Sequence, residues 1–249
     1  MTPLRFLCLG VGDAHSARWY SSCLAVEAAG SWLLIDCPHP IRKILAEAGA
    51  AAGLRLDVGD FAGVLLTHLH ADHASGIEGF AFYTHFGLNR PTVLLAHPAV
   101  EANLWAGHLR DSMGRLLPAP GGGPIVLDQA DYFDYRPLAD EHPTEFGPFT
   151  IECRRTIHHI PTFALRIRAG GRCLGLSADT AYDPGLIAWL AAADLIVHET
   201  NHGPHTPYAS LAALPEDLRR KMRLIHYPDD FDLAASVIEP LIPGRTYAV

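Results

Sequence analysis

The sequence predicts an α/β fold in which two mixed sheets pack face to face and helices cover their outer faces. Short apolar runs bounded by Gly, Ser or Pro, which are typical of strands, alternate with segments of helical periodicity. The second half of the chain repeats the pattern of the first, without tandem repeats or low-complexity tracts. Such a chain buries both kinds of element by stacking them in layers, and we expect residues 1–249 to form a single domain.

The first half of the chain carries five predicted strands and two predicted helices. The run FAGVLLT is continuously apolar, which indicates a strand buried on both faces. Apolar residues recur at helical spacing after His39, and Pro98 suits the first turn of a later helix. The strands are predicted at 4–10, 21–29, 31–37, 61–67 and 91–97, and the helices at 39–50 and 98–114.

The second half of the chain also alternates predicted strands with predicted helices. Segment 116–124, LLPAPGGGP, is predicted to be a surface loop. In the first half, segment 76–90, GIEGFAFYTHFGLNR, is rich in Phe, Tyr and Gly and has two interpretations: it lines a substrate cleft, or it is a packed helix or lid. Strands are predicted at 149–157, 163–169, 172–179, 194–199 and 223–227, and helices at 185–193, 215–222 and 230–241.

Composition narrows the classes of partner. The net charge is −8, and the densest basic cluster, RRKMR at 219–223, reads as the solvated end of a helix, so a long nucleic acid is an unfavourable partner. A small anion remains compatible with a site whose positive charge comes from metal ions. No apolar stretch approaches the roughly 18 to 20 residues that span a bilayer, and the start does not resemble a signal peptide. The five cysteines are scattered without a CxxC pair, which favours the reducing cytoplasm.

The chemistry is concentrated in VLLTHLHADHASG, residues 64–76. His68, His70, Asp72 and His73 fall within six positions directly after an apolar run. Such side chains cost desolvation free energy beside a core, so a partner has to compensate them, and a metal ion is the obvious candidate. On an extended backbone residues two apart point the same way, so His68 and His70 can share one ion, while Asp72 and His73 face a second position.

The motif THLHADH resembles the signature of the metallo-β-lactamase superfamily. Further segments resemble later marks of that superfamily in the right order: TIHHIPTFALRI at 156–167, LSADT at 176–180 and LIHYPDD at 224–230. The closest pattern is that of the ribonuclease Z and phosphodiesterase-like branch. The resemblance covers nearly the whole chain and implies a four-layer αββα sandwich.

The resemblance also implies seven metal ligands. One site would be formed by His68, His70 and His158, and the other by Asp72, His73 and His226, with Asp179 bridging both. His159 competes with His158 for the third place. His158 is preferred because the ligand of the ribonuclease Z branch stands five residues before an aromatic, here Phe163.

Two divalent ions would give this site its reactivity. With two carboxylates and a bridging hydroxide the charges sum to about +1, which attracts an anion and lets the hydroxide attack as nucleophile. Zn²⁺ suits these ligands best, while Mn²⁺ and Fe²⁺ also accept imidazole and carboxylate. Asp72 is expected to serve in catalysis as well as in metal binding. A bridging Asp179 in place of a cysteine ligand disfavours the common zinc β-lactamases.

Two further loops resemble the proton-shuttling loops of ribonuclease Z enzymes. His198 and Glu199 lie in HETN where that branch has HEAT, and His205 lies in HTP where it has HST. They either deliver a proton to the leaving group or form a polar loop that bonds to itself. Asp36 is expected to hold a ligating histidine through its second nitrogen, and His202 is left open. No partner pattern involves His15, His39, His85, His97, His108 or His142.

These features predict a dinuclear metal hydrolase of a phosphodiester or a small cyclic phosphate. The alternative is hydrolysis of a carboxylic ester, lactone or thioester, and a third reading is a metal-binding scaffold without turnover. Transfer-RNA processing is disfavoured, because no long basic arm is present. The expected partner is therefore a small anionic or ester substrate. The sequence leaves the oligomeric state open, with a homodimer among the alternatives.

Overall fold

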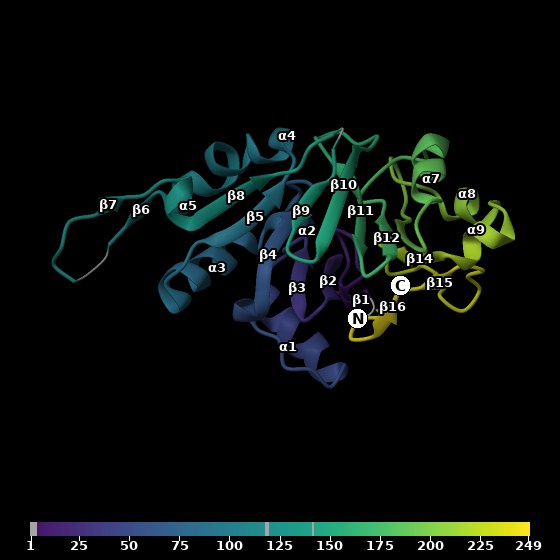
Figure 1. Ribbon diagram of the computed structural model, residues 1–249, viewed down its shortest axis with the longest axis horizontal. Helices are drawn as coiled ribbons and strands as arrows, with labels where there is room; N and C mark the ends of the chain where they lie inside the picture. The colour runs from purple at the N-terminus through teal and green to yellow at the C-terminus, as the bar shows by residue number, and fades with distance from the viewer. Residues whose placement is uncertain (1–3, 118–119, 141) are drawn as a thin grey trace.

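The strands of the N-terminal half form the first of two large sheets. The computed structural model describes residues 4–117, 120–140 and 142–249 (Figure 1). In the first sheet the strand order is β16-β1-β2-β3-β4-β5-β8. The four strands β3, β4, β5 and β8 are mutually parallel. Its members are β1 (Arg5–Gly10), β2 (Cys23–Ala28), β3 (Ser31–Ile35), β4 (Phe61–Leu66), β5 (Thr92–Ala96), β8 (Phe133–Pro137) and β16 (Thr246–Ala248).

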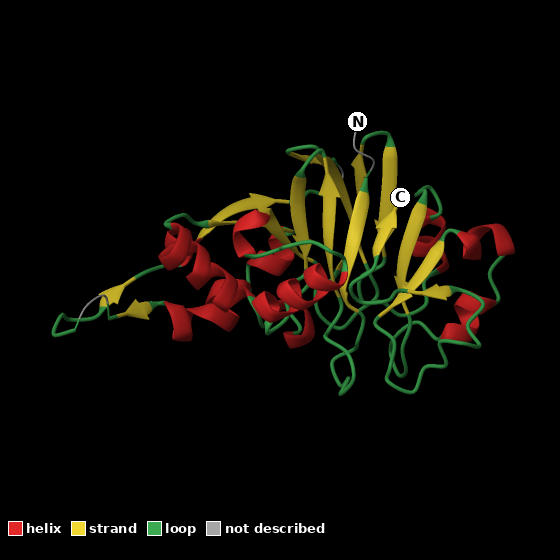
Figure 2. Ribbon diagram, turned by 90° about the horizontal axis from the view of Figure 1, so that it is seen from below, coloured by secondary structure: helices red, strands yellow, loops and turns green. Residues whose placement is uncertain are grey.

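The second sheet also has seven strands, in the order β15-β14-β13-β12-β11-β10-β9. Strands β12 to β15 are parallel, and β9 to β12 are joined as antiparallel neighbours. Its members are β9 (Thr144–Phe146), β10 (Phe149–Arg155), β11 (Phe163–Ala169), β12 (Arg172–Leu176), β13 (Leu195–Glu199), β14 (Met222–Ile225) and β15 (Glu239–Pro240). A small hairpin of β6 (Arg115–Leu116) and β7 (Ile125–Val126) projects from the body (Figures 1 and 2).

Helices lie outside the two sheets. Helices α1, α3 and α5 lie on the side of the first sheet, and α7, α8 and α9 on the side of the second (Figure 1). The α-helices are α1 (Ile41–Ala51), α2 (Ala71–Ala74), α3 (Ile77–Phe82), α4 (Pro98–Glu101), α5 (Arg110–Met113), α6 (Gln129–Tyr132), α7 (Pro184–Leu190), α8 (Tyr208–Ala212) and α9 (Glu216–Arg220). The 3₁₀ turn η1 (Val58–Asp60) and the π-helical turns η2 (Tyr83–Gly87) and η3 (Trp105–Leu109) complete the set. The predicted metallo-β-lactamase fold is confirmed. No helix in the described ranges is long and apolar enough to cross a membrane.

One predicted helix is wrong. Segment 230–241 forms turns and the short strand β15 instead. The carboxylate of Asp232 accepts hydrogen bonds from the backbone amides of Ala234 and Ala235, which closes a local turn in place of a helix. The hydroxyl of Tyr208 then accepts the amide of Val237, and Pro240 cannot continue a helix.

Other elements differ in extent. Segment 98–114 is divided into α4, η3 and α5 by the π-helical turn. Segment 76–90 is helical, as α3 and η2, with Ile77 and Phe80 packed into the core. Part of the predicted loop 116–124 falls on residues 118–119, outside the described ranges. Strands β8, β9 and β16 and helices α6 and α8 were not predicted, because each is short and lacks a distinct period.

Gly76 allows two loops to lie close together: the loop of residues 67–76, which carries the THLHADH motif and is called the motif loop below, and the loop after β3. Its amide donates to the carbonyl of Cys37 at 2.7 Å, and the amide of Cys37 donates to the carbonyl of His73 at 2.6 Å. A Cβ at Gly76 would lie 2.5 Å from the carbonyl oxygen of Pro38, which is backbone that cannot move freely. The absence of a side chain at Gly76 therefore sets the distance between the two loops.

We predict that Gly76→Ala lowers stability by about 1–3 kcal/mol, because overpacking against backbone forces a shift. Gly79→Ala is the matched control: Gly79 lies in α3, a Cβ there meets nothing within 4 Å, and the change should stabilise by about 0.5–1 kcal/mol. Denaturant unfolding of both variants measures this. Equal stability of the two variants would contradict the packing argument.

Candidate metal centre

The candidate ligands meet at one edge of the sandwich, where strands of both sheets end. The motif loop follows β4, Asp179 follows β12 and His226 follows β14, each at the carboxyl end of a parallel strand. His158 comes from the loop between β10 and β11. In α/β folds, small molecules and ions bind outside the carboxyl ends of the strands. The candidate metal-ligating side chains converge at this same position.

The first cluster consists of His68, His70, His158 and Asp179. One potential ligand atom from each lies within 4.8 Å of all the others. Nε2 of His158 is 3.2 Å from Nδ1 of His70, and Nε2 of His68 is 3.7 Å from a carboxylate oxygen of Asp179. The rival His159 is exposed, with its ring 4.2 Å from that of His158, and is not a member of the cluster.

The second cluster consists of Asp72, His73, Asp179 and His226 and meets the same distance criterion. Nε2 of His226 lies 3.1 Å from Asp72, and Nε2 of His73 lies 3.3 Å from both Asp72 and Asp179. Asp179 belongs to both clusters: Oδ1 is the atom near His73, while Oδ2 is the atom near His68. Oδ2 also lies 3.6 Å from Nε2 of His226, so Asp179 lies between the two clusters and is a potential ligand of both.

These separations fit ligands around metal ions. Zn–N bonds of about 2.0–2.1 Å in a tetrahedron place neighbouring ligand atoms roughly 3.3 Å apart. The pairs of ligand atoms given above are 3.1 to 3.7 Å apart, and all ligand atoms within each cluster lie within 4.8 Å of one another. In addition, Nε2 of His68 and Nε2 of His73 are buried without a hydrogen-bond partner among the described residues. Such atoms would be costly without compensation, and divalent cations would satisfy them.

A buried carboxylate behind the clusters orients two of the histidines. Asp36 accepts the amide of Thr67 at 2.8 Å and the Thr67 hydroxyl at 2.8 Å, and Nδ1 of His73 lies 2.8 Å away. Because the Thr67 hydroxyl gives its only hydrogen to Asp36, it accepts from Nδ1 of His68 at 3.0 Å. Both histidines are thus held with hydrogen on Nδ1, which leaves Nε2 free to bind a metal. The expected supporting position of Asp36 is the one the structure shows.

The electrostatics of the clusters favour cations. Burial alone would raise the pKa of Asp179, but His73 and His226 outweigh it and hold the pKa well below its ordinary value. Burial alone would also raise the pKa of Asp72, but the hydrogen bond with His226 and the ion pair with His73 outweigh it and lower the pKa. Burial lowers the pKa of His158 to about 4, so this imidazole is neutral at pH 7. For His73 and His226, burial lowers the pKa, but Asp179 outweighs it and raises the pKa of both, so these two imidazoles would release a proton when a metal ion binds.

Three residues at this edge adopt left-handed backbone conformations that non-glycine residues rarely take. Asp36 has φ 58°, Ala178 has φ 49° and His226 has φ 58°, each just after a strand. Strained residues of this kind cluster at functional sites, where surrounding structure holds them. Here the left-handed conformation turns the chain so that the side chains of Asp36 and His226 point toward the clusters. At Ala178 the same turn directs the next residue, Asp179, toward them.

Glu199 and His205 adjoin the second cluster. Oε1 of Glu199 accepts the amide of Thr180 at 2.7 Å and lies 2.9 Å from Nδ1 of His205. Burial raises the pKa of Glu199, and although burial lowers the pKa of His205, the bond to Glu199 outweighs it and the pKa of His205 is raised. The His205 ring lies 5.2 Å from that of His226 and 5.6 Å from that of His158. His205 therefore lies beside both clusters.

His198 is separated from this pair. Successive side chains of a strand point to opposite faces, and Glu199 of β13 points to the clusters, so His198 points away. Nδ1 of His198 lies 2.7 Å from the carbonyl of Glu199, and burial lowers the pKa of His198 to about 4. The proximity of His198 to Glu199 in sequence does not place the two side chains together.

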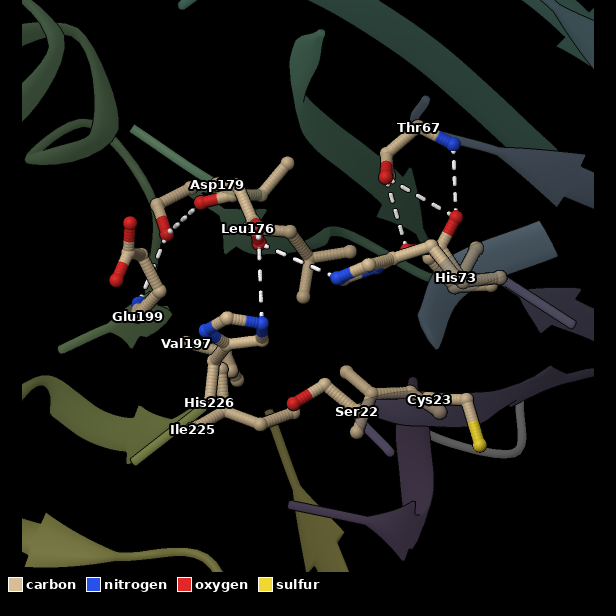
Figure 3. Close-up of a pocket in the computed structure, with 15 residues that line it drawn as sticks. Ser22, Cys23, Thr67, His73, Leu176, Asp179, Val197, Glu199, Ile225 and His226 are labelled. Carbon is tan, nitrogen blue, oxygen red and sulfur yellow. Dashed lines mark hydrogen bonds and ion pairs between the residues drawn. The ribbon is translucent and has the colours of Figure 1, made fainter. Parts of the chain in front are cut away.

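Two cavities adjoin the clusters. An internal cavity of ≈ 40 Å³ lies behind them, lined by Cys23, Leu176, Val197 and Ile225 together with His73 and His226 (Figure 3). An open cavity of ≈ 550 Å³ lies in front and includes His205 and His226. It also includes His15, which the sequence pattern did not single out, and His202, whose role the sequence left open. His97, by contrast, stacks on Phe163 with ring centroids 3.9 Å apart, which is a packing role.

Comparison with known proteins identifies the relatives of this chain. The family model described as Anti-Pycsar protein Apyc1 matches residues 4–238. The Anti-Pycsar protein Apyc1 of Bacillus phage 010DV004 is 30% identical over 256 residues, which is 96% of this chain and 96% of that protein.

Solved structures share the fold at lower identity. The metallo-β-lactamase fold protein YhfI from Bacillus subtilis superposes with a TM-score of 0.73 at 18% identity, covering 98% of this chain and 99% of that one. The short form of human tRNase Z gives a TM-score of 0.69 at 17% identity, with 98% of each chain covered.

We predict two metal ions per chain, with His158 rather than His159 among the ligands. His158→Ala should lose about one ion and more than roughly 100-fold in activity, since a lost ligand costs more than a lost supporting contact. His159→Ala is the matched control and should retain both ions. Asp179→Ala should lower occupancy at both positions together. Elemental analysis of metal-replete protein measures the content.

A content of one ion or fewer per chain in the metal-replete wild-type protein would contradict the dinuclear centre. Loss of metal in His159→Ala with retention in His158→Ala would reassign the ligand.

Proposed function

The chain belongs to the Anti-Pycsar protein Apyc1 family and is a metallo-β-lactamase-fold hydrolase, and we propose that it hydrolyses a cyclic nucleotide at a dinuclear metal centre. Apyc1 proteins degrade cyclic nucleotide signals. The single observation that carries the proposal is the pair of clusters joined by Asp179, which offers two metal positions to one phosphate group. We propose Zn²⁺ as the metal, because it binds imidazole nitrogens and carboxylate oxygens well, and the first cluster offers three imidazoles and one carboxylate while the second offers two of each.

The assignment of ligands follows the geometry. His68, His70 and His158 would hold one ion, Asp72, His73 and His226 the other, and Asp179 would bridge them. When bound, the two ions supply the positive charge that polarises a phosphoryl oxygen and activates water. Asp36 and Thr67 keep His68 and His73 in the required tautomer throughout. The ionised Asp72 and Asp179 leave the bound pair a small positive charge, which suits a phosphodiester monoanion.

Hydrolysis adds water across one phosphorus–oxygen bond of the ring. A new bond forms between phosphorus and the water oxygen, and the bond to one ribose oxygen breaks. The electron pair of the broken bond stays on the ribose oxygen, which needs a proton because an alkoxide is a poor leaving group. His205 lies beside both clusters and is held by Glu199, so we assign it as the donor. Glu199 orients the imidazole and stabilises its protonated form.

A substrate panel tests the proposal. Metal-replete protein should hydrolyse 3′,5′-cyclic nucleotides to nucleoside monophosphates, with slower or no turnover of lactones, thioesters and a β-lactam. Chromatographic separation of the products measures this. Preferential cleavage of a lactone or thioester would instead assign the centre to carboxylic ester hydrolysis, and no turnover of any of these by protein with two bound ions would leave it as a metal-binding scaffold.

We predict that His205→Ala and Glu199→Gln slow cyclic nucleotide hydrolysis about 10²- to 10⁴-fold, the range typical of general-acid catalysis. Both should slow bis(4-nitrophenyl) phosphate much less, because nitrophenolate leaves without a proton. His198→Ala is the control: its side chain points to the opposite face, so any loss should be equal for both substrates. Steady-state kinetics with metal content checked gives the comparison. Equal losses on both substrates for His205→Ala would contradict its role as donor.

A further inference from the structure

A cavity of ≈ 550 Å³ opens in front of the metal-ligand clusters, and this volume suits a nucleotide-sized ligand. Three loops form its walls: the loop after β1, the loop after β13 and the loop after β14. Its residues in those loops include Asp13, His15, Asn201, His202 and Asp229. His205 and His226 line its inner end, so the cavity is continuous with the candidate centre.

The walls are fixed in place before any ligand binds. Asp13 accepts the amide of His15 and the side-chain amide of Asn201, both at 2.9 Å, which ties the first loop to the second. Asp229 accepts the hydroxyl of Ser16 and the amide of Ala17, which ties the first loop to the third. Because the loops are joined in this way, the cavity keeps its shape without the cost of ordering a loop on binding.

Two imidazoles line this cavity without strong partners in the described chain. His15 is exposed, and its side chain makes no hydrogen bond that the described residues provide. His202 is 76% exposed, and its nearest carboxylate is the equally exposed Asp230 at 3.5 Å. Imidazole rings stack on nucleobases and bond to their edges. The carboxylates of Asp13 and Asp229 make the same walls unfavourable for a phosphate, which leaves them to an uncharged group.

The chemistry of the substrate orients it in this cavity. Both ester oxygens of a 3′,5′-cyclic nucleotide belong to the ribose, so the ribose must lie against the group that protonates the leaving oxygen. Resting on the function proposed above, we infer that the ribose lies against His205 and that the base extends into the open cavity, where His15 and His202 bind it. His15 and His202 are then substrate-binding residues that determine the KM of the enzyme.

Steady-state kinetics with cyclic AMP tests this inference. His15→Ala, His202→Ala and the double variant should raise KM, by at least about fivefold in the double variant, at the low end of base-stacking contributions. The kcat should stay within about twofold, because neither residue contacts the clusters. His15→Phe and His202→Phe, which keep a flat ring, should recover most of the lost affinity. Both positions are exposed, and thermal unfolding with metal analysis verifies that each variant is intact.

Tyr182→Ala is the matched control. Tyr182 is 37% exposed and lies next to Ala181, whose amide donates to Ile157 in the loop of His158, on the other rim of the centre. Its KM should equal that of the wild-type protein. An unchanged KM in the double variant, or a raised KM in Tyr182→Ala alone, would overturn the inference while leaving the proposed function intact. Failure of the wild-type protein to hydrolyse any cyclic nucleotide would overturn both.

Discussion

The buried carboxylate of Asp36 is the contact on which the candidate centre depends. It accepts the amide and hydroxyl of Thr67 and faces Nδ1 of His73, so it fixes the start and the end of the motif loop at once. Through Thr67 it also sets the tautomer of His68. A buried carboxylate costs a great deal unless such donors surround it. The same donors that stabilise Asp36 therefore leave two Nε2 atoms facing inward, where cations can compensate them.

The sheet architecture supplies the remaining ligands. Parallel strands of both sheets end at one edge, and the reversed backbone at Ala178 and His226 turns the chain directly after β12 and β14. This lets Asp179 approach His73, and His226 approach Asp72, although the loop of His73 and Asp72 lies more than one hundred residues earlier in the chain. Short strand-end segments anchored in the core move little, so the geometry of the clusters is set by the fold before any metal binds.

The spacing of residues in the sequence was sufficient to predict part of the candidate metal centre. Residues two apart in an extended loop share a direction, which is why His68 and His70 could be grouped from the sequence. The same alternation separates His198 from Glu199, although adjacency in the sequence suggested a pair. Nothing in the sequence pairs His15 with His202, because their loops are brought together by a bond between the distant residues Asp13 and Asn201. The turn at Asp232 likewise depends on a side-chain bond that helical periodicity does not register.

The candidate metal ligands and the walls of the cavity in front of them are formed by different parts of the fold. Most candidate ligands lie at or just after strand ends and their anchors are buried, whereas His15 and His202 in the cavity walls are exposed loop residues. Loops tolerate substitution better than the elements that they connect. A change at His15 or His202 can therefore alter which base is bound without disturbing Asp36 or Asp179. The same division explains physically how a fold shared at 17–18% sequence identity can keep one arrangement of layers while its loop residues change.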